Sequence, residues 1–485
     1  MQPTTGPNRR SIVALMLTLA LIGSACGSRR SVEEIAAASA SAAAGPVERG
    51  AGVAGGSTAD SDDAASPAVE GDTRSPSSPT RSGVSTVGPS TGSGSTSPTG
   101  DATTGGGAAG TTGGGGAPAP GTGEIVIASV GSYSGIPGSV FAEAPLTVQG
   151  WARSVNEGGG IGGRTVKVLV LDDQGDLSRH QTLVRRAVEE QGVIAFVASH
   201  APLTGSASVD YLNQQGVVTI GGQGTDAWFS TSAVHFSVTA VGADLNYLYA
   251  AAIKRFADSE GLNNYGVIYC VESASCSEFA DSTSRFAEEL GMNVVYKQGA
   301  SIAQPDFTSE CLSARNQGVE VLNVGLDGNS LRRLAGACAR QSFRPNYFQP
   351  SEGLENNMLG DPNLDGTITG SPIFPVTLGG TPAADRIRAE IDRYIGDVDN
   401  LLLVAQAWIS AMALERALRD VVGDVDRSDV LTGLRTISNE DFGGLTAPIT
   451  YTEANKNPPI CYWVVAIVDG EMTRPDGLER QCRSR

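Results

Sequence analysis

Apolar and polar positions between residues 124 and 240 follow two alternating patterns, which predict strands and helices in turn. Short apolar runs bounded by glycine or polar residues predict buried strands. Stretches with apolar residues three and four positions apart predict helices between them, one with Ser178 as its N-cap. The strands are expected at 124–130, 165–171, 193–198, 217–220 and 235–238, and the helices at 142–156, 178–191 and 204–215. Strands that alternate with helices in this way form a parallel sheet covered on both faces.

The same alternation restarts near residue 241. It predicts helices at 244–259, 277–290, 308–316 and 330–341, and strands at 265–269, 293–297 and 319–324. A single sheet of all these strands would approach the usual limit of about ten strands, so the pattern favours two lobes. Three further helices, at 381–394, 401–421 and 428–437, are expected to return to the first lobe, and two strands are expected at 447–452 and 462–470.

We therefore predict an α/β fold of two Rossmann-like lobes with parallel sheets, joined by hinge crossings. Lobe 1 is expected at about 124–240 and 371–445, and lobe 2 at about 241–370 and 446–485. Ligands of such sheets bind where strands end and helices begin. The expected ligand site is therefore the cleft between the lobes.

The first 122 residues have a different composition. Arg9 and Arg10 precede a short apolar run at 12–22, which is typical of a secretory signal and shorter than the roughly 20 residues that span a bilayer. Because the run ends in small residues and Cys26, it resembles a bacterial lipoprotein signal, which implies cleavage after residue 25 and lipidation of Cys26. Ordinary cleavage beside an incidental cysteine is the alternative.

Residues 26–122 are mostly Gly, Ser, Thr, Ala and Pro, which cannot bury enough apolar surface to fold. They predict a disordered tether, although a wall-spanning or glycosylated stalk has the same composition. The folded part is expected at 123–485, held by lipid on the extracytoplasmic face of the cell membrane.

Charge and candidate chemistry exclude several classes of function. The net charge of −18, from 34 Lys and Arg against 52 Asp and Glu, disfavours a nucleic-acid partner. Three scattered histidines disfavour a zinc site and most histidine-based catalysis. The glycine run at 158–163 lacks the Lys-Ser/Thr ending of a phosphate loop. The segment 361–366 resembles half of a calcium loop, but Pro372 stands where the bidentate glutamate is needed. We expect no enzyme, no metal and no cofactor.

Six cysteines follow Cys26, and an even number in an exported chain suggests three disulfides. The predicted order of elements favours local pairs. Cys270 ends a strand and Cys276 opens the next helix, Cys311 and Cys338 lie on consecutive helices, and Cys461 and Cys482 bracket the last strand. These pairs are the prediction, and reduced buried cysteines are the alternative.

Several short motifs occur together in one order. They are Gly-Ser-Tyr-Ser-Gly at 131–135, Asn-Glu-Gly-Gly-Gly-Ile-Gly-Gly-Arg at 156–164, Asp-Asp-Gln-Gly-Asp at 172–176 and Phe-Gly-Gly at 442–444. Over about 124–475 the chain resembles the type I solute-binding proteins of branched-chain amino-acid ABC importers. The resemblance implies a monomer that closes on an amino-acid-like small molecule and delivers it to ABC permease subunits. A ligand sensor ectodomain of the same fold is the alternative.

The resemblance also implies where the ligand binds. Two loops, 199–206 and 221–225, would hold its carboxylate through backbone N–H and hydroxyl groups, with Thr204 or Thr225 as hydroxyl donors unless both are plain helix caps. Glu352 matches an acidic residue that pairs with the ligand ammonium, unless it is a solvated turn residue. The family's aromatic positions fall near Ser275 and Leu326. The expected ligand-binding residues are Tyr133, Phe141, His200, Ala201, Thr204, Gln223, Thr225, Ser275, Leu326 and Glu352.

Overall fold

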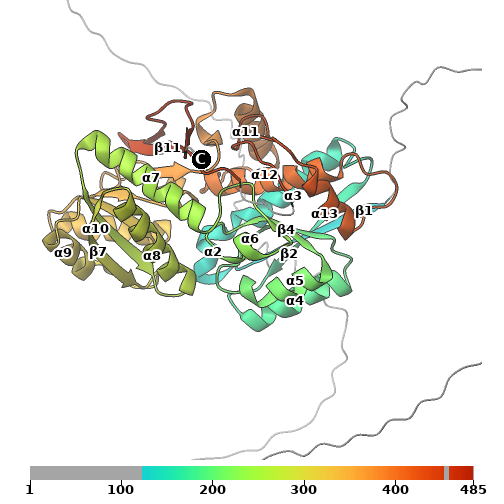
Figure 1. Cartoon of the computed structure of the whole chain (residues 1–485), viewed down its shortest axis with the longest axis horizontal. Coiled ribbons are helices and arrows are strands. Elements are labelled where there is room, and N and C mark those ends of the chain that lie inside the picture. Colours follow the sequence, from blue (N-terminus) through green and yellow to red (C-terminus); the bar gives the residue numbers. More distant parts are fainter. Residues whose placement is uncertain (1–122, 453–457, 484–485) are drawn as a thin grey trace, which may run out of the picture. The chain divides into compact units, whose positions relative to one another are not determined.

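The computed structural model describes residues 123–452 and 458–483. The predicted signal segment, Cys26 and the tether lie outside these residues. Figure 1 shows the described chain as helices and strands arranged around two sheets. Within the described ranges, no helix has the length and apolar character needed to cross a membrane.

The first sheet has five parallel strands in the order β2-β1-β3-β4-β5. Their bounds are β1 (Glu124–Gly131), β2 (Thr165–Asp172), β3 (Ala195–Ser199), β4 (Val218–Gly222) and β5 (His235–Phe236). The helices between them are α2 (Gly135–Phe141), α3 (Glu143–Glu157), α4 (Leu177–Glu189), α5 (Val209–Gln215) and α6 (Trp228–Thr231), with the 3-10 turn η1 (Gly205–Ser208).

Three later helices return to this sheet: α11 (Pro382–Tyr394), α12 (Leu401–Leu418) and α13 (Arg427–Arg435). Helix α12 packs against α3, β3 and β4, and its apolar side chains join the core of the first lobe. The apolar run that predicts this helix is long because the helix is buried among other elements.

The second sheet follows the order β12-β11-β10-β9-β8-β6-β7, with β13 paired to β11. Its strands are β6 (Asn264–Cys270), β7 (Asn293–Ala300), β8 (Val321–Gly325), β9 (Asn346–Phe348), β10 (Ile368–Ser371), β11 (Cys461–Val468), β12 (Glu471–Thr473) and β13 (Gln481–Cys482). Its helices are α7 (Ala243–Glu260), α8 (Ala274–Glu289), α9 (Thr308–Asn316) and α10 (Gly328–Arg340), and the 3-10 turns η2 (Ser351–Gly353), η3 (Asn356–Met358) and η4 (Val376–Leu378) follow.

This second sheet is parallel from β6 to β10 and antiparallel at its edge. Strand β11 runs antiparallel to β10, and β12 and β13 run antiparallel to β11. The β11–β12 turn consists of Asp469 and Gly470, both with positive φ, the conformation of a tight two-residue hairpin. A loop this short can join only antiparallel strands, so the prediction of parallel sheets holds for the body of this sheet and is wrong at its edge.

Some local predictions are wrong for identifiable reasons. Asp176, not Ser178, caps α4, because its carboxylate accepts a hydrogen bond from the N–H of Arg179 at 2.7 Å. The segment 447–452 is not a strand, and only Ile449 forms an isolated bridge, with Glu440. The helix predicted at 204–215 begins as the separate turn η1.

The chain passes between the two sheets through short segments. It leaves the first sheet after β5 and enters α7 through 237–242, and it returns after β10 through 372–375. Tyr451 anchors the last passage, because its ring packs edge-on against Phe236 and its hydroxyl donates to the carbonyl of Ser237 at 2.6 Å. These segments are the crossings about which the lobes can hinge.

Three disulfides lie in the second lobe and join Cys270 to Cys276, Cys311 to Cys338, and Cys461 to Cys482. These are the same pairs that the order of elements predicts.

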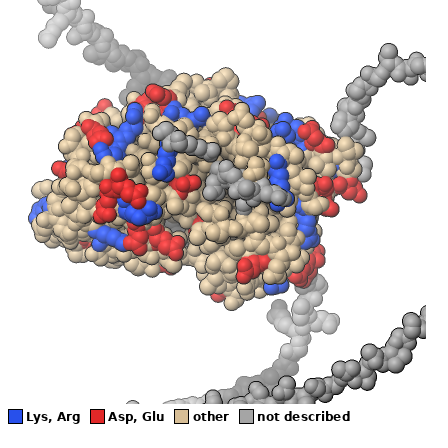
Figure 2. Space-filling view, in the orientation of Figure 1, with Lys and Arg blue, Asp and Glu red and all other residues tan. Residues whose placement is uncertain are grey.

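Ion pairs between exposed side chains contribute little to the stability of the fold, about 0–1 kcal/mol each. On the face shown in Figure 2, Lys and Arg side chains lie scattered among Asp and Glu side chains.

Candidate ligand-binding cleft

A cavity of about 330 Å³ lies where residues from the two lobes meet. Its size is at the lower end of the roughly 300–1,000 Å³ that small-molecule sites occupy. The second lobe contributes residues within 270–279, 325–327 and 349–353, which follow the carboxyl ends of β6, β8 and β9. The first lobe contributes Val140, Phe141, Pro202, Leu203, Gln223 and Thr225. The cavity therefore lies at the sheet edges where the topology predicts a ligand.

The structure brings six of the ten expected ligand-binding residues to this cavity. These are Phe141, Gln223, Thr225, Ser275, Leu326 and Glu352. The other four are buried in the first lobe and do not line the cavity: Tyr133, His200, Ala201 and Thr204.

Thr204 belongs to a buried hydrogen-bond network in the first lobe. Its hydroxyl donates to the carboxylate of Asp173 at 2.6 Å, which also accepts from Ser132 at 2.7 Å and contacts His180 Nδ1 at 2.8 Å. Burial alone would raise the pKa of Asp173, but the hydrogen bonds from His180, Thr204 and Ser132 hold it below its ordinary value. The hydroxyl proton of Thr204 is engaged in this network, so here the residue is a structural donor rather than a ligand donor.

His200 and Tyr133 are buried in the first lobe behind the cavity, and His200 contacts Phe141 directly. The imidazole of His200 stacks on the Phe141 ring at 5.2 Å, and its Nδ1 lies 3.1 Å from the carbonyl of Ala198. Burial lowers the pKa of His200 to about 4, so the ring is neutral at neutral pH. The Tyr133 hydroxyl bonds to Ser129 at 2.7 Å, and burial raises its pKa. Both residues support the cavity wall from inside the lobe.

Glu352 is the most unusual group of the cavity. It lies on η2 and is 7% exposed. Burial raises the pKa of its carboxyl to about 7, although a hydrogen bond from Gln223 of the first lobe acts in the opposite direction. Its backbone carbonyl accepts a hydrogen bond from the side chain of Asn400, which caps α12 of the first lobe. Glu352 therefore contacts the opposite lobe through both its side chain and its backbone.

A second buried carboxyl faces Glu352 from the first lobe. Asp226 is 1% exposed, and burial, followed by the charges of Glu352 and Glu278, raises its pKa well above its ordinary value. A carboxyl whose pKa is shifted by burial and by the charge of a nearby carboxyl is common at functional sites.

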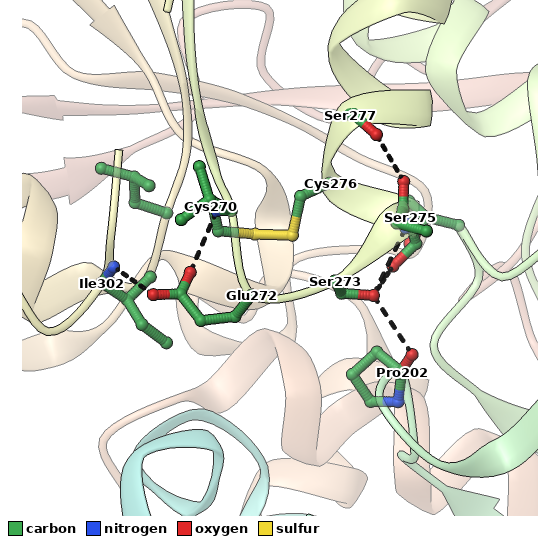
Figure 3. The surroundings of a disulfide bond; sticks show 12 residues. Pro202, Cys270, Glu272, Ser273, Ser275, Cys276, Ser277 and Ile302 are labelled. Atoms are coloured by element: carbon green, nitrogen blue, oxygen red, sulfur yellow. Dashed lines mark hydrogen bonds between the residues drawn. A yellow bond between two sulfur atoms is a disulfide. The ribbon is translucent and has the colours of Figure 1, made fainter. Parts of the chain in front are cut away.

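The loop 270–276 carries further polar groups of the second-lobe wall of the cavity and is closed by the Cys270–Cys276 disulfide (Figure 3). Ser273 caps α8 and also lies 3.4 Å from the carbonyl of Pro202 in the first lobe. Glu272 accepts hydrogen bonds from Ser301 at 2.7 Å and from the N–H of Ile302 at 3.0 Å, so its carboxylate is satisfied within the second lobe. The sequence analysis expected Ser275 of this loop at the site and missed Glu272 and Ser273, although two cysteines six positions apart directly after a strand were a usable signal.

Comparison with known proteins decides the family. A family model described as periplasmic binding protein matches residues 124–471. The chain belongs to the periplasmic binding protein family. The predicted family and the two-lobed α/β fold are thereby confirmed. No curated protein sequence matches the chain.

Solved structures of this family share the fold at low sequence identity. A leucine-binding protein (LivK) of Thermotoga maritima is 15% identical, with a TM-score of 0.61 over 72% of this chain and 97% of its own. LivJ of Streptococcus pneumoniae, solved with isoleucine, is 14% identical, with a TM-score of 0.63 over 74% and 99%. A fatty acid ABC transporter substrate-binding protein of Thermomonospora curvata is 17% identical, with a TM-score of 0.63 over 74% and 93%. The fold is thus that of binding proteins that work with ABC transporters.

Proposed function

We propose that this protein is an extracytoplasmic solute-binding protein that captures a small molecule bearing an amino group and delivers it to an ABC importer. The ligand class is an amino acid or a related compound. The observation that carries the proposal is the buried, interlobe carboxyl of Glu352 in a cavity of about 330 Å³. A carboxylate in such a site is stabilised by a ligand cation.

Ligand capture follows from the position of the cavity. Three contacts join its two walls: Gln223 with Glu352, Ser273 with Pro202, and Asn400 with the Glu352 carbonyl. A ligand that adds contacts to both walls favours the closed arrangement, and movement about the interlobe crossings opens it. The closed pair of lobes is the form that a permease would recognise.

The charge of the cavity, rather than the names of the structural neighbours, favours a nitrogenous ligand over a fatty acid. LivJ and LivK are named for amino-acid binding, and the Thermomonospora protein for fatty acids. A fatty-acid carboxylate in this cavity would lie near Glu352 and be repelled by its charge, whereas an ammonium would be attracted.

Anchoring is proposed from the N-terminal sequence. A signal peptide at 1–25, lipidation at Cys26 and a tether to residue 122 would hold the binding domain at 123–485 near membrane permease subunits. A Cys26→Ser variant is then expected in the aqueous phase after detergent partitioning, while wild type stays in the detergent phase. Retention of the variant in the detergent phase would contradict lipid anchoring.

Thermal unfolding in the presence of a metabolite panel tests the central function. A compound that binds only the native state stabilises it by about 2.7 kcal/mol at a hundredfold excess over Kd. The expected result is stabilisation by at least one amine or amino acid, and a much smaller effect of the same compound on Glu352→Gln. A panel in which no nitrogenous compound stabilises the protein would reject solute binding of this kind.

A further inference from the structure

We propose that the cleft recognises an organic cation with an apolar body, an amine that carries no carboxylate, in preference to a zwitterionic amino acid or an organic acid. This rests on the proposed solute-binding function and narrows its ligand class. It follows from which polar groups of the cavity already have partners and which do not.

The charge that lines the cavity has one sign. Its ionisable lining residues are Glu272, Asp327 and Glu352, and the lining set contains no Lys, Arg or His. Asp226 adds a further buried carboxyl, close enough to Glu352 for the two charges to interact. A carboxylate brought into this cavity would meet like charge without a basic partner, whereas a cation would meet opposite charge.

In the first-lobe loop 199–206, hydrogen-bond donors that a carboxylate would need are already used. In the first-lobe loop, Pro202 has no N–H, and the N–H groups of Thr204 and Gly205 donate to the carbonyl of Ala201 at 3.1 and 2.7 Å. The Thr204 hydroxyl donates to Asp173. The loop therefore presents few free donors to a ligand anion.

The polar atoms left without partners at the cavity are acceptors. Gln349 lines the cavity and is 1% exposed, and its Nε2 donates to the carbonyl of Leu326 at 2.9 Å. Because a carbonyl can only accept, this contact fixes the amide orientation and leaves Oε1 as the free atom. Among the described residues that line the cavity, the buried side-chain atoms Gln349 Oε1 and Gln223 Oε1 have no hydrogen-bond partner. Buried acceptors without donors are costly, and an ammonium supplies three N–H donors.

Two helix N-termini at the cavity do not reverse this preference. Helices α8 and α10 begin beside the cavity, and such termini attract anions. The Ser273 side chain accepts from the N–H of Ser275 at 3.3 Å, and the Asp327 carboxylate accepts from the N–H of Ser330 at 3.1 Å. At α10 the place of an anion is thus taken by a carboxylate of the protein itself.

The rest of the wall suits an apolar body. Phe141 and Leu203 of the first lobe and Phe279, Ile302 and Leu326 of the second line the cavity. Aromatic rings also attract cations. A wall that buries apolar surface beside the site of the ligand's charge favours a compound with an apolar body and one polar end.

The experiment compares compounds that share an apolar body and differ in charge. Isothermal titration of the full-length protein in mild detergent at pH 8 uses 3-methylbutylamine, leucine and 3-methylbutanoate, and then phenethylamine, phenylalanine and 3-phenylpropanoate. Each amine is expected to bind at least tenfold more tightly than its amino acid, and the acids are expected not to bind. Gln349→Met and Glu352→Gln should each weaken amine binding at least tenfold. Glu355→Gln changes a buried carboxyl outside the lining set and should leave amine binding within twofold.

Three outcomes would overturn the inference. They are an amino acid that binds as tightly as its amine, an acid that binds, or failure of both amines to bind. If an amino acid binds and stabilises the protein, the solute-binding function stands and only the preference for a carboxylate-free cation is wrong. If no nitrogenous compound of the wider panel binds, the proposed function fails as well.

Discussion

Replacing Glu352 with glutamine tests the electrostatic reasoning without a ligand. The carboxyl has an ordinary pKa of 4.5 in an exposed chain, and burial raises this pKa to about 7 in the folded protein. Below pH 4.5 the group is protonated in both the folded and the unfolded state. As the pH rises, the unfolded state loses its proton first, so the folded protein loses stability until the pH passes the folded pKa.

The size of this effect follows from the pKa change. At about 1.4 kcal/mol per pKa unit, a rise from 4.5 to about 7 corresponds to about 3 kcal/mol of lost stability at pH 8. Removing the Glu352 charge also removes its repulsion of the Asp226 carboxylate, which further stabilises the folded variant relative to wild type. The ligand-free Glu352→Gln protein is therefore expected to be close to wild type at pH 4.5 and more stable by up to about 3 kcal/mol at pH 8.

Urea unfolding at pH 4.5, 6 and 8, followed by tryptophan fluorescence, measures the difference between the two proteins. Glu289→Gln, at a side chain 52% exposed in an ion pair with Arg285, serves as the control and should show little difference at any pH. If the difference in free energy of unfolding between Glu352→Gln and wild type stays constant from pH 4.5 to 8, the idea of a buried, titrating Glu352 is refuted.

Two further predictions concern the framework of the cleft. The double variant Cys270→Ser/Cys276→Ser loses the disulfide that closes a short loop, which lowers stability by about 2 kcal/mol through chain entropy. It should also bind ligand more weakly, because Ser273 is no longer held against the first lobe. Ligand affinity equal to wild type in calorimetry would contradict this role. Tyr451→Phe leaves the buried carbonyl of Ser237 without its donor and should destabilise the protein by about 1–3 kcal/mol, measured as a lower urea midpoint, whereas an unchanged midpoint would show that the crossing does not depend on this bond.

The fold could be predicted from the sequence because its long elements carry strong periodic patterns. Helix α9 (Thr308–Asn316) matches its predicted range, and Thr381 begins α11 as its N-cap. Strands β9 and β10, of 3 and 4 residues, are too short to show a period, and their pairing depends on neighbours distant in sequence. The segment 447–452 has strand-like composition, but its only ladder contact among the described residues is the isolated bridge between Ile449 and Glu440.

The cleft could be predicted only in part, because its chemistry depends on which groups meet in space. Glu352 and Gln223 were expected because their loops resemble ligand-binding loops of the family. The sequence could not show that Asp173 takes the proton of Thr204, since the two residues are 31 positions apart. It also could not show that Gln349 keeps a free acceptor, because its partner is the backbone of Leu326 on a neighbouring strand end.

The position of Glu352 at the boundary of both lobes makes proton exchange part of ligand capture. Near neutral pH the buried carboxyl is partly protonated, because its pKa is about 7. A cationic ligand that binds beside it favours the ionised form and expels the proton to the solvent. The measured heat of binding should then depend on the ionisation enthalpy of the buffer at pH 6 to 7, and this dependence should vanish above pH 8. Acidification of the surrounding compartment would weaken ligand binding, so the affinity of the binding protein would decrease as the local pH falls.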